Sequence, residues 1–165
     1  MKVDISDILR IDGTSLKLEF HEEPPERKPA EGFELTGDLE FAGTLTNTDG
    51  ILHLDGRLKA NYSSACYRCL STVSKTLDLK IREDFISSAD VGQSDMYPFE
   101  GKVLDISKAL NDNIILYLPM KQLCSEKCRG LCSKCGANLN EVQCGCVGDD
   151  IDPRMEGLNK FFEQY

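Results

Sequence analysis

Eight cysteines constrain this chain of 165 residues more than any other feature, and six of them lie between Cys124 and Cys146. They follow the order C-x-x-C at 66–69, C-x3-C-x3-C-x-x-C at 124–135 and C-x-C at 144–146. Eight thiols make two complete sets of four, and four thiolates in tetrahedral array are a usual ligand set of structural zinc. Gly136, directly after a C-x-x-C pair, permits a tight turn that directs both sulfurs at one metal. The pattern therefore predicts two zinc ions.

A disulfide framework is the alternative interpretation of so many cysteines. Secreted disulfide scaffolds are usually small chains that carry a signal peptide. Residues 1–13 lack the continuous apolar core of a signal peptide, and no stretch of the chain approaches the about 20 apolar residues that span a bilayer. We therefore expect a cytoplasmic protein without a membrane segment, where cysteine clusters favour metal over disulfides. A thiol-redox role for the C-x-x-C pairs is a third interpretation.

The chain is acidic, with a formal net charge of −9. Two zinc ions bound to eight thiolates would bring this charge to about −13. Such acidity opposes broad binding to nucleic-acid phosphates, which calls for a basic surface. It suits association with a basic partner, and equally a surface whose charge only keeps the protein in solution.

Alternation of apolar and polar residues up to Phe85 is typical of strands with one buried face. Ser15–Phe20 is the first such segment, and a proline-rich connector at 21–32 follows it. Three longer segments come next, and Thr48-Asp49-Gly50 predicts a tight turn between the first two. We expect an antiparallel meander of three successive strands, with the Cys66–Cys69 pair at the tip of its second hairpin.

Two helices are expected after the sheet. Asp105 suits a helix N-cap, Pro119 would end that helix, and the apolar face between them is formed by Ile106, Leu110, Ile114 and Tyr117. The polar residues 87–101 before it predict a loop. Near the C-terminus, Asp152-Pro153 suits the start of a second helix, whose apolar stripe consists of Met155, Leu158, Phe161, Phe162 and Tyr165. This stripe would dock on the sheet or on the metal module, or it would fit the groove of a partner.

The predicted fold class is therefore α+β. It comprises an antiparallel β meander with a flanking helix, a C-terminal cysteine-rich zinc module and a terminal helix. The length suits one ordinary domain, or one domain with a small appendage. We place a sheet domain with one helix at 1–118, and the zinc module with the C-terminal helix at 119–165.

The cysteines can share two metals in two ways. In the first grouping, one site is Cys66, Cys69, Cys124 and Cys128, and the other is Cys132, Cys135, Cys144 and Cys146. In the second grouping, the four cysteines from Cys124 to Cys135 form one site and the two distant pairs meet. The first grouping is preferred because it makes one metal a clip between sheet and helix, closing a long loop of the chain. The eight residues between Cys135 and Cys144 also suffice for a zinc hairpin.

No motif in the sequence indicates an enzyme. A zinc site closed by four protein ligands has no open position for water, whereas catalytic zinc usually keeps one. Glycine-rich phosphate loops, nucleophile elbows and paired catalytic carboxylates are lacking. The only histidines, His21 and His53, are better explained as surface or hydrogen-bonded residues than as ligands.

Several short segments also stand in a specific order along the chain. They are Cys66-Tyr-Arg-Cys69-Leu70, Leu118-Pro119-Met120, the run LCSEKCRGLCSKCGANLN, a C-x-C pair and Asp152-Pro153-Arg154. Each is generic, but together they resemble the YceD family of large ribosomal RNA subunit accumulation proteins over essentially the whole chain. The resemblance implies a non-enzymatic protein needed for normal accumulation of large-subunit ribosomal RNA. It also supports the first cysteine grouping, because some relatives lack the segment matching Cys132–Cys146 yet keep the other four positions.

Two functions from different classes fit these observations. The first is a zinc-binding factor that supports large-subunit ribosomal RNA accumulation or assembly. The candidate RNA or partner contacts are the basic residues beside the cysteines, namely Arg68, Lys121, Lys127, Arg129 and Lys134. The same residues would also offset the negative charge of the zinc–thiolate sites. The second function is an acidic adaptor that binds a basic protein, such as a ribosomal protein, and acts on RNA only through it.

Overall fold

The computed structural model describes residues 1–24, 29–90 and 95–146. Within them the chain forms seven strands, one short 3-10 helix and one α-helix. In chain order the elements are β1 Lys2–Asp4, η1 Ile8–Arg10, β2 Ser15–Glu22, β3 Phe33–Thr48, β4 Ile51–Ala65, β5 Thr72–Ser87, β6 Tyr97–Phe99, β7 Val103–Asp105 and α1 Ser107–Tyr117.

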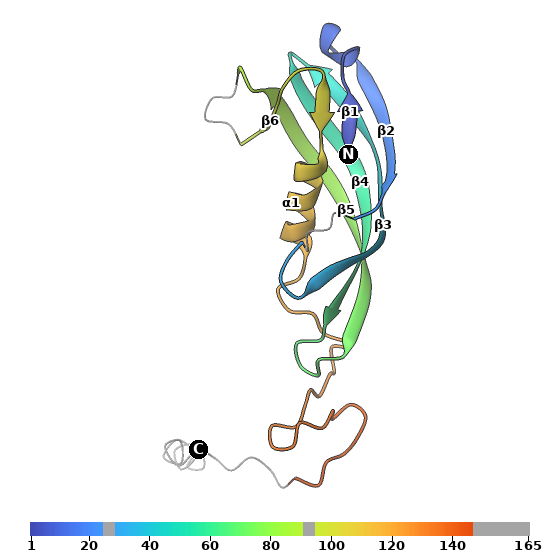
Figure 1. Cartoon of the computed structure of the whole chain (residues 1–165), viewed down its shortest axis with the longest axis vertical. Coiled ribbons are helices and arrows are strands. Elements are labelled where there is room, and N and C mark those ends of the chain that lie inside the picture. Colours follow the sequence, from blue (N-terminus) through green and yellow to red (C-terminus); the bar gives the residue numbers. More distant parts are fainter. Residues whose placement is uncertain (25–28, 91–94, 147–165) are drawn as a thin grey trace, which may run out of the picture.

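A five-stranded sheet dominates the molecule, with the strand order β2-β3-β4-β5-β6. Strands β2 to β5 pair antiparallel in sequence order, whereas β6 joins β5 in parallel. The antiparallel meander expected from the alternation pattern is therefore confirmed, and β2 extends it by one strand. Figure 1 shows that β3, β4 and β5 are long and twisted, so that the molecule is elongated along them.

The turn between β3 and β4 explains the tight register of the long hairpin. Thr48 pairs with Ile51, which leaves a two-residue loop. Both loop residues have positive φ, 51° at Asp49 and 83° at Gly50. Two positive φ angles are the mark of the type I′ turn, whose twist matches that of paired strands. The buried Asn47 side chain completes the turn by accepting a hydrogen bond from the Gly50 N–H.

The inner face of the sheet carries the core, and α1 packs across it (Figure 1). The helix contributes the fully buried Leu110 and Ile114, and burying such a side chain stabilises the fold by about 1.5–3 kcal/mol. Beside the large sheet, β1 and β7 form a two-stranded antiparallel sheet. Its Leu104 is also fully buried, which ties the segment before α1 to the same core.

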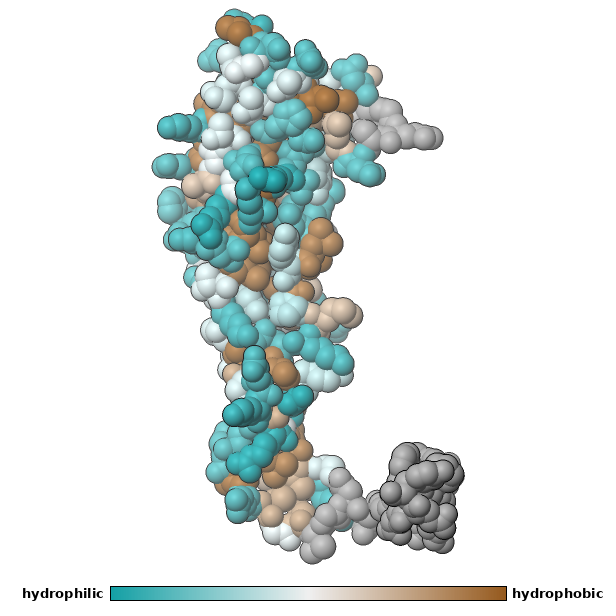
Figure 2. All heavy atoms as spheres, turned by 180° about the vertical axis from the view of Figure 1, so that it is seen from behind, coloured by the Kyte–Doolittle hydropathy of each residue, from teal (hydrophilic) through white to brown (hydrophobic). Residues whose placement is uncertain are grey.

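The outer face of the sheet is polar. Cross-strand ion pairs link Arg82 to Asp55 and Arg57 to Asp78 on neighbouring strands. His53 Nδ1 lies 2.6 Å from an Asp84 carboxylate oxygen, which agrees with its interpretation as a hydrogen-bonded surface residue. Figure 2 shows the side opposite α1, where hydrophilic side chains cover most of the sheet. One face therefore supports the core and the other meets solvent, as in many antiparallel sheets.

Three details of the predicted elements are wrong. Tyr117 does not share the buried helix face but is 57% exposed, and Leu118 is buried in its place. The segment 87–101 is not only loop, because β6 lies within it. Asp105 precedes the helix by two residues; its carboxylate nevertheless accepts a hydrogen bond from the Ser107 N–H at 2.9 Å. Strand β6 escaped prediction because a parallel edge pairing of three residues leaves no periodicity to detect.

The cysteine-rich segment lies at the end of the molecule where the β4–β5 hairpin turns (Figure 1). This confirms that the Cys66–Cys69 pair occupies a hairpin tip. The predicted terminal helix falls at 153–165, outside the described residues. The division at residue 118 into two domains stays a prediction. Among the described residues, no helix combines the length and apolar character needed to cross a membrane.

Two glycines that face each other across β3 and β4 make room for the ring of Phe41. A Cβ atom added to Gly56 would lie 2.5 Å from the Phe41 ring and 2.8 Å from the Ala42 carbonyl oxygen. Phe41 is 2% exposed, and its ring lies against both glycines. We expect Gly56→Ala to lower the free energy of unfolding by about 1–3 kcal/mol, which chemical denaturation would measure. The cost should shrink when Phe41→Leu is also present; an equal cost in both backgrounds would contradict this packing.

Candidate metal centres

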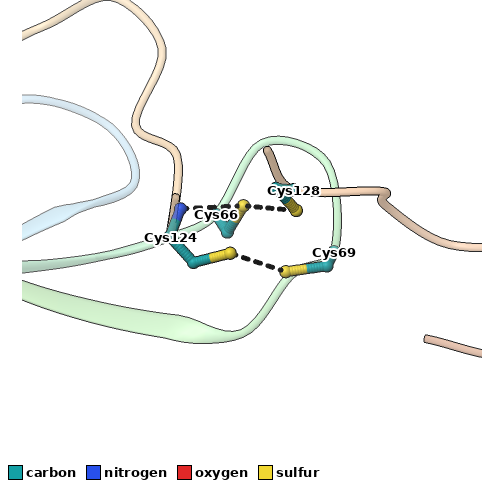
Figure 3. A group of neighbouring side chains, drawn as sticks. All are labelled: Cys66, Cys69, Cys124 and Cys128. Carbon is teal, nitrogen blue, oxygen red and sulfur yellow. Dashed lines mark hydrogen bonds between the residues drawn. The ribbon is translucent and has the colours of Figure 1, made fainter. Parts of the chain in front are cut away.

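The first group of cysteines joins two distant parts of the chain. Cys66 and Cys69 come from the β4–β5 hairpin loop, and Cys124 and Cys128 come from the segment after α1 (Figure 3). The four sulfurs lie within 4.8 Å of one another. Cys66 Sγ is 3.8 Å from Cys128 Sγ, and Cys69 Sγ is 3.6 Å from Cys124 Sγ. Three of the four residues are buried, with Cys124 exposed.

Backbone hydrogen bonds shape the hairpin loop into a metal-binding knuckle. The Leu70 N–H donates to the Cys66 carbonyl oxygen at 2.9 Å, and the Cys66 N–H donates to the Ser71 carbonyl oxygen at 2.8 Å. These bonds turn the chain back within six residues and bring both sulfurs of the pair to one side. Leu70 has a φ of 59°, in the left-handed region that glycine normally occupies.

Polar contacts hold the segment after α1 against the hairpin. The Tyr67 N–H donates to the Gln122 carbonyl oxygen at 2.8 Å. The buried Gln122 side chain accepts a hydrogen bond from the Tyr62 hydroxyl at 3.0 Å. Arg68 Nη1 donates to the Cys128 carbonyl oxygen at 2.9 Å. The two halves of the first group are thus positioned by the protein itself.

The second group consists of Cys132, Cys135, Cys144 and Cys146, whose sulfurs also lie within 4.8 Å of one another. Its knuckle repeats the hydrogen bonds of the first. The Gly136 N–H donates to the Cys132 carbonyl oxygen at 2.9 Å, and the Cys132 N–H donates to the Ala137 carbonyl oxygen at 2.8 Å. Gly136 has a φ of 73° and stands where Leu70 stands in the first knuckle. None of the four cysteines is buried, so little of the core supports this group.

Asn140 connects the two groups. It lies in the hairpin of the second group, yet its Nδ2 donates to Cys128 Sγ of the first group at 3.3 Å. Its Oδ1 accepts a hydrogen bond from the Arg129 N–H at 2.8 Å. Close by, the Leu131 N–H donates to the Arg68 carbonyl oxygen at 3.1 Å. The second hairpin is therefore held against the first site by several hydrogen bonds, in addition to the connecting chain.

The local environment favours thiolates in both groups. Burial opposes ionisation of Cys66, but hydrogen bonds from backbone N–H groups, first those of Cys69 and Cys124, outweigh it and lower its pKa to about 6. In the second group, backbone N–H groups led by that of Cys135 lower the pKa of Cys132 to about 6. Burial also opposes ionisation of Cys128, but hydrogen bonds, first that from the Asn140 side chain, outweigh it and lower its pKa. Each group thus holds at least one sulfur that favours the anionic form.

A second thiol in each group resists ionisation. Contacts with the other sulfurs, first that of Cys128, raise the pKa of Cys124 to about 12. Contacts led by that of Cys135 raise the pKa of Cys146 to about 12. The cause is the same in both groups. A second thiolate would lose its hydrogen bond to a neighbouring sulfur and would be repelled by the thiolate already present. A divalent cation would remove this repulsion by balancing the thiolates.

The sulfur spacing fits a metal better than a disulfide. Four sulfurs at about 2.3 Å from a central zinc ion are about 3.8 Å apart, close to the separations of 3.6 and 3.8 Å in the first group. A disulfide requires about 2.05 Å, and all eight cysteines are free. The structure brings the cysteines together in the first of the two groupings expected from the sequence.

The predicted basic contacts differ in their surroundings. Arg68 is occupied by its bond to Cys128 and has a structural part. Lys121 extends its ammonium over the ring of Tyr67, 4.9 Å from the ring centroid. The other three, Lys127, Arg129 and Lys134, are exposed on the cysteine-rich segment. In the sequence, all five lie within or next to the segments that carry the cysteines, at 66–69 and 121–134.

Sequence reasoning missed three residues of this region. Asn140 gave no signal, because an asparagine in a turn is commonplace. Tyr67 and Leu70 are each 65% exposed on the first knuckle. A signal for Leu70 did exist: a large apolar residue stands after Cys69, at the position that Gly136 fills after Cys135.

The sequence is similar to those of several known proteins. A relative from Arabidopsis thaliana, "Large ribosomal RNA subunit accumulation protein YCED homolog 1, chloroplastic", is 38% identical over 68 residues, 41% of this chain and 21% of its own length. Its Zea mays counterpart of the same name is 27% identical over 135 residues, 62% of this chain and 46% of its own. The matched regions thus span about a fifth and about half of these plant relatives.

An uncharacterized protein of Mycobacterium tuberculosis matches over more of the chain. It is 27% identical over 169 residues, which cover 96% of this chain and 79% of the relative. No solved structure gives a significant match. The sequence model of the family "Large ribosomal RNA subunit accumulation protein YceD" matches residues 54–162, from β4 through both cysteine groups. On this match, the chain belongs to the YceD family.

Proposed function

We propose that the protein is a non-enzymatic factor that binds two zinc ions and supports the accumulation or assembly of large-subunit ribosomal RNA. The observation that carries the proposal is the pair of four-sulfur groups within the region that matches the family. The family description supplies the link to large-subunit ribosomal RNA. Free thiols held in fours suit a reducing compartment, and we place the protein in the cytoplasm.

Each zinc ion would be held by four cysteine sulfurs and would act as a structural cross-link. The first group, with Cys66 and Cys128 at its buried side, would clip the sheet to the segment after α1. Four protein ligands fill a tetrahedral zinc, so neither site offers the open position that zinc catalysis uses. The filled coordination of both sites supports a role other than catalysis.

Loss of one ligand should affect the two groups differently. Cys66→Ser removes a buried sulfur at the sheet, so we expect loss of one zinc per chain, a lower melting temperature and weaker protection of amides near the β4–β5 tip. Cys144→Ser should also lose one zinc, but the amides of β2 to β5 should keep their protection. Metal analysis and hydrogen exchange measure these effects, and the two variants serve as controls for each other. Equal loosening of the sheet in both would contradict the assignment.

Direct contact with RNA is the form of the function that we favour. Lys127, Arg129 and Lys134 are exposed beside the cysteine groups and could reach phosphates. A handful of such contacts gives weak binding with steep salt dependence, with a log–log slope of about −0.9 per neutralised phosphate on a duplex. Local positive charge would then act despite the acidic total of −9.

The net charge itself supports a second candidate. An acidic adaptor would bind a basic protein, such as a ribosomal protein, and would reach the RNA only through it. A strand edge could supply the contact surface.

Removing two basic side chains separates these candidates. For direct binding, Arg129→Ala with Lys134→Ala should reduce the salt slope of RNA binding by roughly one to two units at unchanged zinc content. The control replaces Lys17 and Lys80, two exposed lysines on the sheet, and should leave the slope close to that of the parent protein. Salt-independent RNA binding, or a partner protein that stays bound after nuclease treatment while RNA binding is lacking, would favour the adaptor instead.

A further inference from the structure

Two large side chains protrude from the tip of the first knuckle. Tyr67 and Leu70 are each 65% exposed, although they flank cysteines that are almost fully buried. Single exposed apolar residues are ordinary on protein surfaces. Here, however, two of them lie on one turn of a loop whose ends are held by a cluster of four sulfurs.

Leu70 also has an unfavourable backbone conformation. Its φ of 59° is in the left-handed region, where a β-carbon crowds the carbonyl oxygen. Gly136 fills the equivalent place in the second knuckle, with the same hydrogen bonds to its own loop. A glycine at position 70 would therefore form the turn with less strain. The exposed side chain gains little burial in return, so folding alone does not explain its presence.

The loop under these side chains is held by backbone hydrogen bonds and is locally basic. The Tyr67 N–H is bonded to the Gln122 carbonyl oxygen, and the Leu70 N–H to the Cys66 carbonyl oxygen. Lys121 Nζ lies 4.9 Å from the centroid of the Tyr67 ring. Between residues 121 and 135 there are four basic residues and one acidic residue, Glu126. An aromatic and an apolar side chain thus stand on one loop, and the ammonium group of Lys121, from the segment after α1, lies over the aromatic ring.

We propose that this knuckle tip binds an unpaired nucleotide of RNA, with the base stacked on Tyr67, its edge against Leu70 and a phosphate near Lys121. The proposal rests on the proposed function, since it names the RNA contact of that same region. Single-stranded RNA is commonly recognised by stacking of splayed bases on aromatic side chains. Two side chains are too few for a stable protein interface, which needs about 800 Å² on each partner and is depleted in lysine. They match the size of one base.

The sequence offers a direct spectroscopic test, because it contains no tryptophan. Tyr67→Trp would place a single indole at the knuckle tip. A stacked base should quench its fluorescence when a 12-nucleotide single-stranded RNA of mixed sequence is added, and much less so with the duplex of that sequence. The matched control is Tyr117→Trp, at an exposed tyrosine on α1, which should show no quenching. Equal signals from the two variants, or from the two RNAs, would overturn the proposal.

The affinity of each variant for the single-stranded RNA completes the test. The zinc content of each variant is measured as a control. Tyr67→Ala should weaken binding of the single-stranded RNA about 5- to 100-fold, whereas Tyr67→Phe and the control Tyr117→Ala should not. Leu70→Gly should weaken it as well, while the melting temperature stays the same or rises. A lower melting temperature with unchanged RNA binding would make Leu70 structural and contradict its assigned contact.

The outcomes distinguish this inference from the function beneath it. If the parent protein binds the RNA and Tyr67→Ala binds it equally well, the knuckle-tip contact is wrong but direct RNA binding stands. If the parent protein binds no RNA, direct RNA contact and the knuckle-tip inference both fail. A third outcome is that the parent protein keeps a bound partner protein after nuclease treatment, and that Tyr67→Ala and Leu70→Gly lose this partner. The tip would then be a protein contact, and the RNA assignment would be overturned.

Discussion

The approach of Cys66 and Cys69 to Cys124 and Cys128 holds together the end of the molecule that carries both cysteine groups. It brings the tip of the β4–β5 hairpin to the segment that leaves α1, more than fifty residues later in the chain. The second hairpin is then supported by the first group through Asn140 and the Leu131–Arg68 hydrogen bond. Without a cation, four sulfurs so close together would share protons and repel further ionisation, as the raised pKa of Cys124 indicates. A metal would convert this repulsion into a cross-link.

The sheet acts as a long support for this end of the molecule. Its inner face is closed by α1 and its outer face is polar, so the strands can extend well beyond the helix toward the cysteine groups (Figure 1). Phe41 fills the space left by Gly43 and Gly56 and keeps the long hairpin packed. The knuckle tip is therefore attached to a well-packed sheet. A contact that is already ordered before binding loses less conformational entropy when it binds. This arrangement connects the core, where the apolar residues lie, to the region that carries the exposed Tyr67 and Leu70.

Much of the fold and of the cysteine grouping could be predicted from the sequence. The features that could not be predicted depend on contacts between distant segments. Alternation of apolar residues revealed the meander, Asp49-Gly50 revealed its turn, and cysteine spacing led to the observed grouping. The meander and its turn depend on short-range patterns that a sequence displays directly. The grouping of distant cysteine pairs rested on the long loop that the first site closes and on the family resemblance. Strand β6, the exposed Tyr117 and the hydrogen bond from Asn140 to Cys128 depend on contacts between distant segments. The left-handed Leu70 contradicted local propensity, and such conflicts tend to mark functional positions.

Zinc-edge X-ray absorption on the purified protein, combined with metal quantification, would test both metal centres at once. We expect two zinc ions per chain, each surrounded by four sulfurs at about 2.3 Å, with no nitrogen or oxygen in the inner coordination sphere. All eight thiols should become titratable once the metal is chelated. A protein with no bound metal and eight freely reactive thiols, or with disulfides within the two groups, would contradict this expectation.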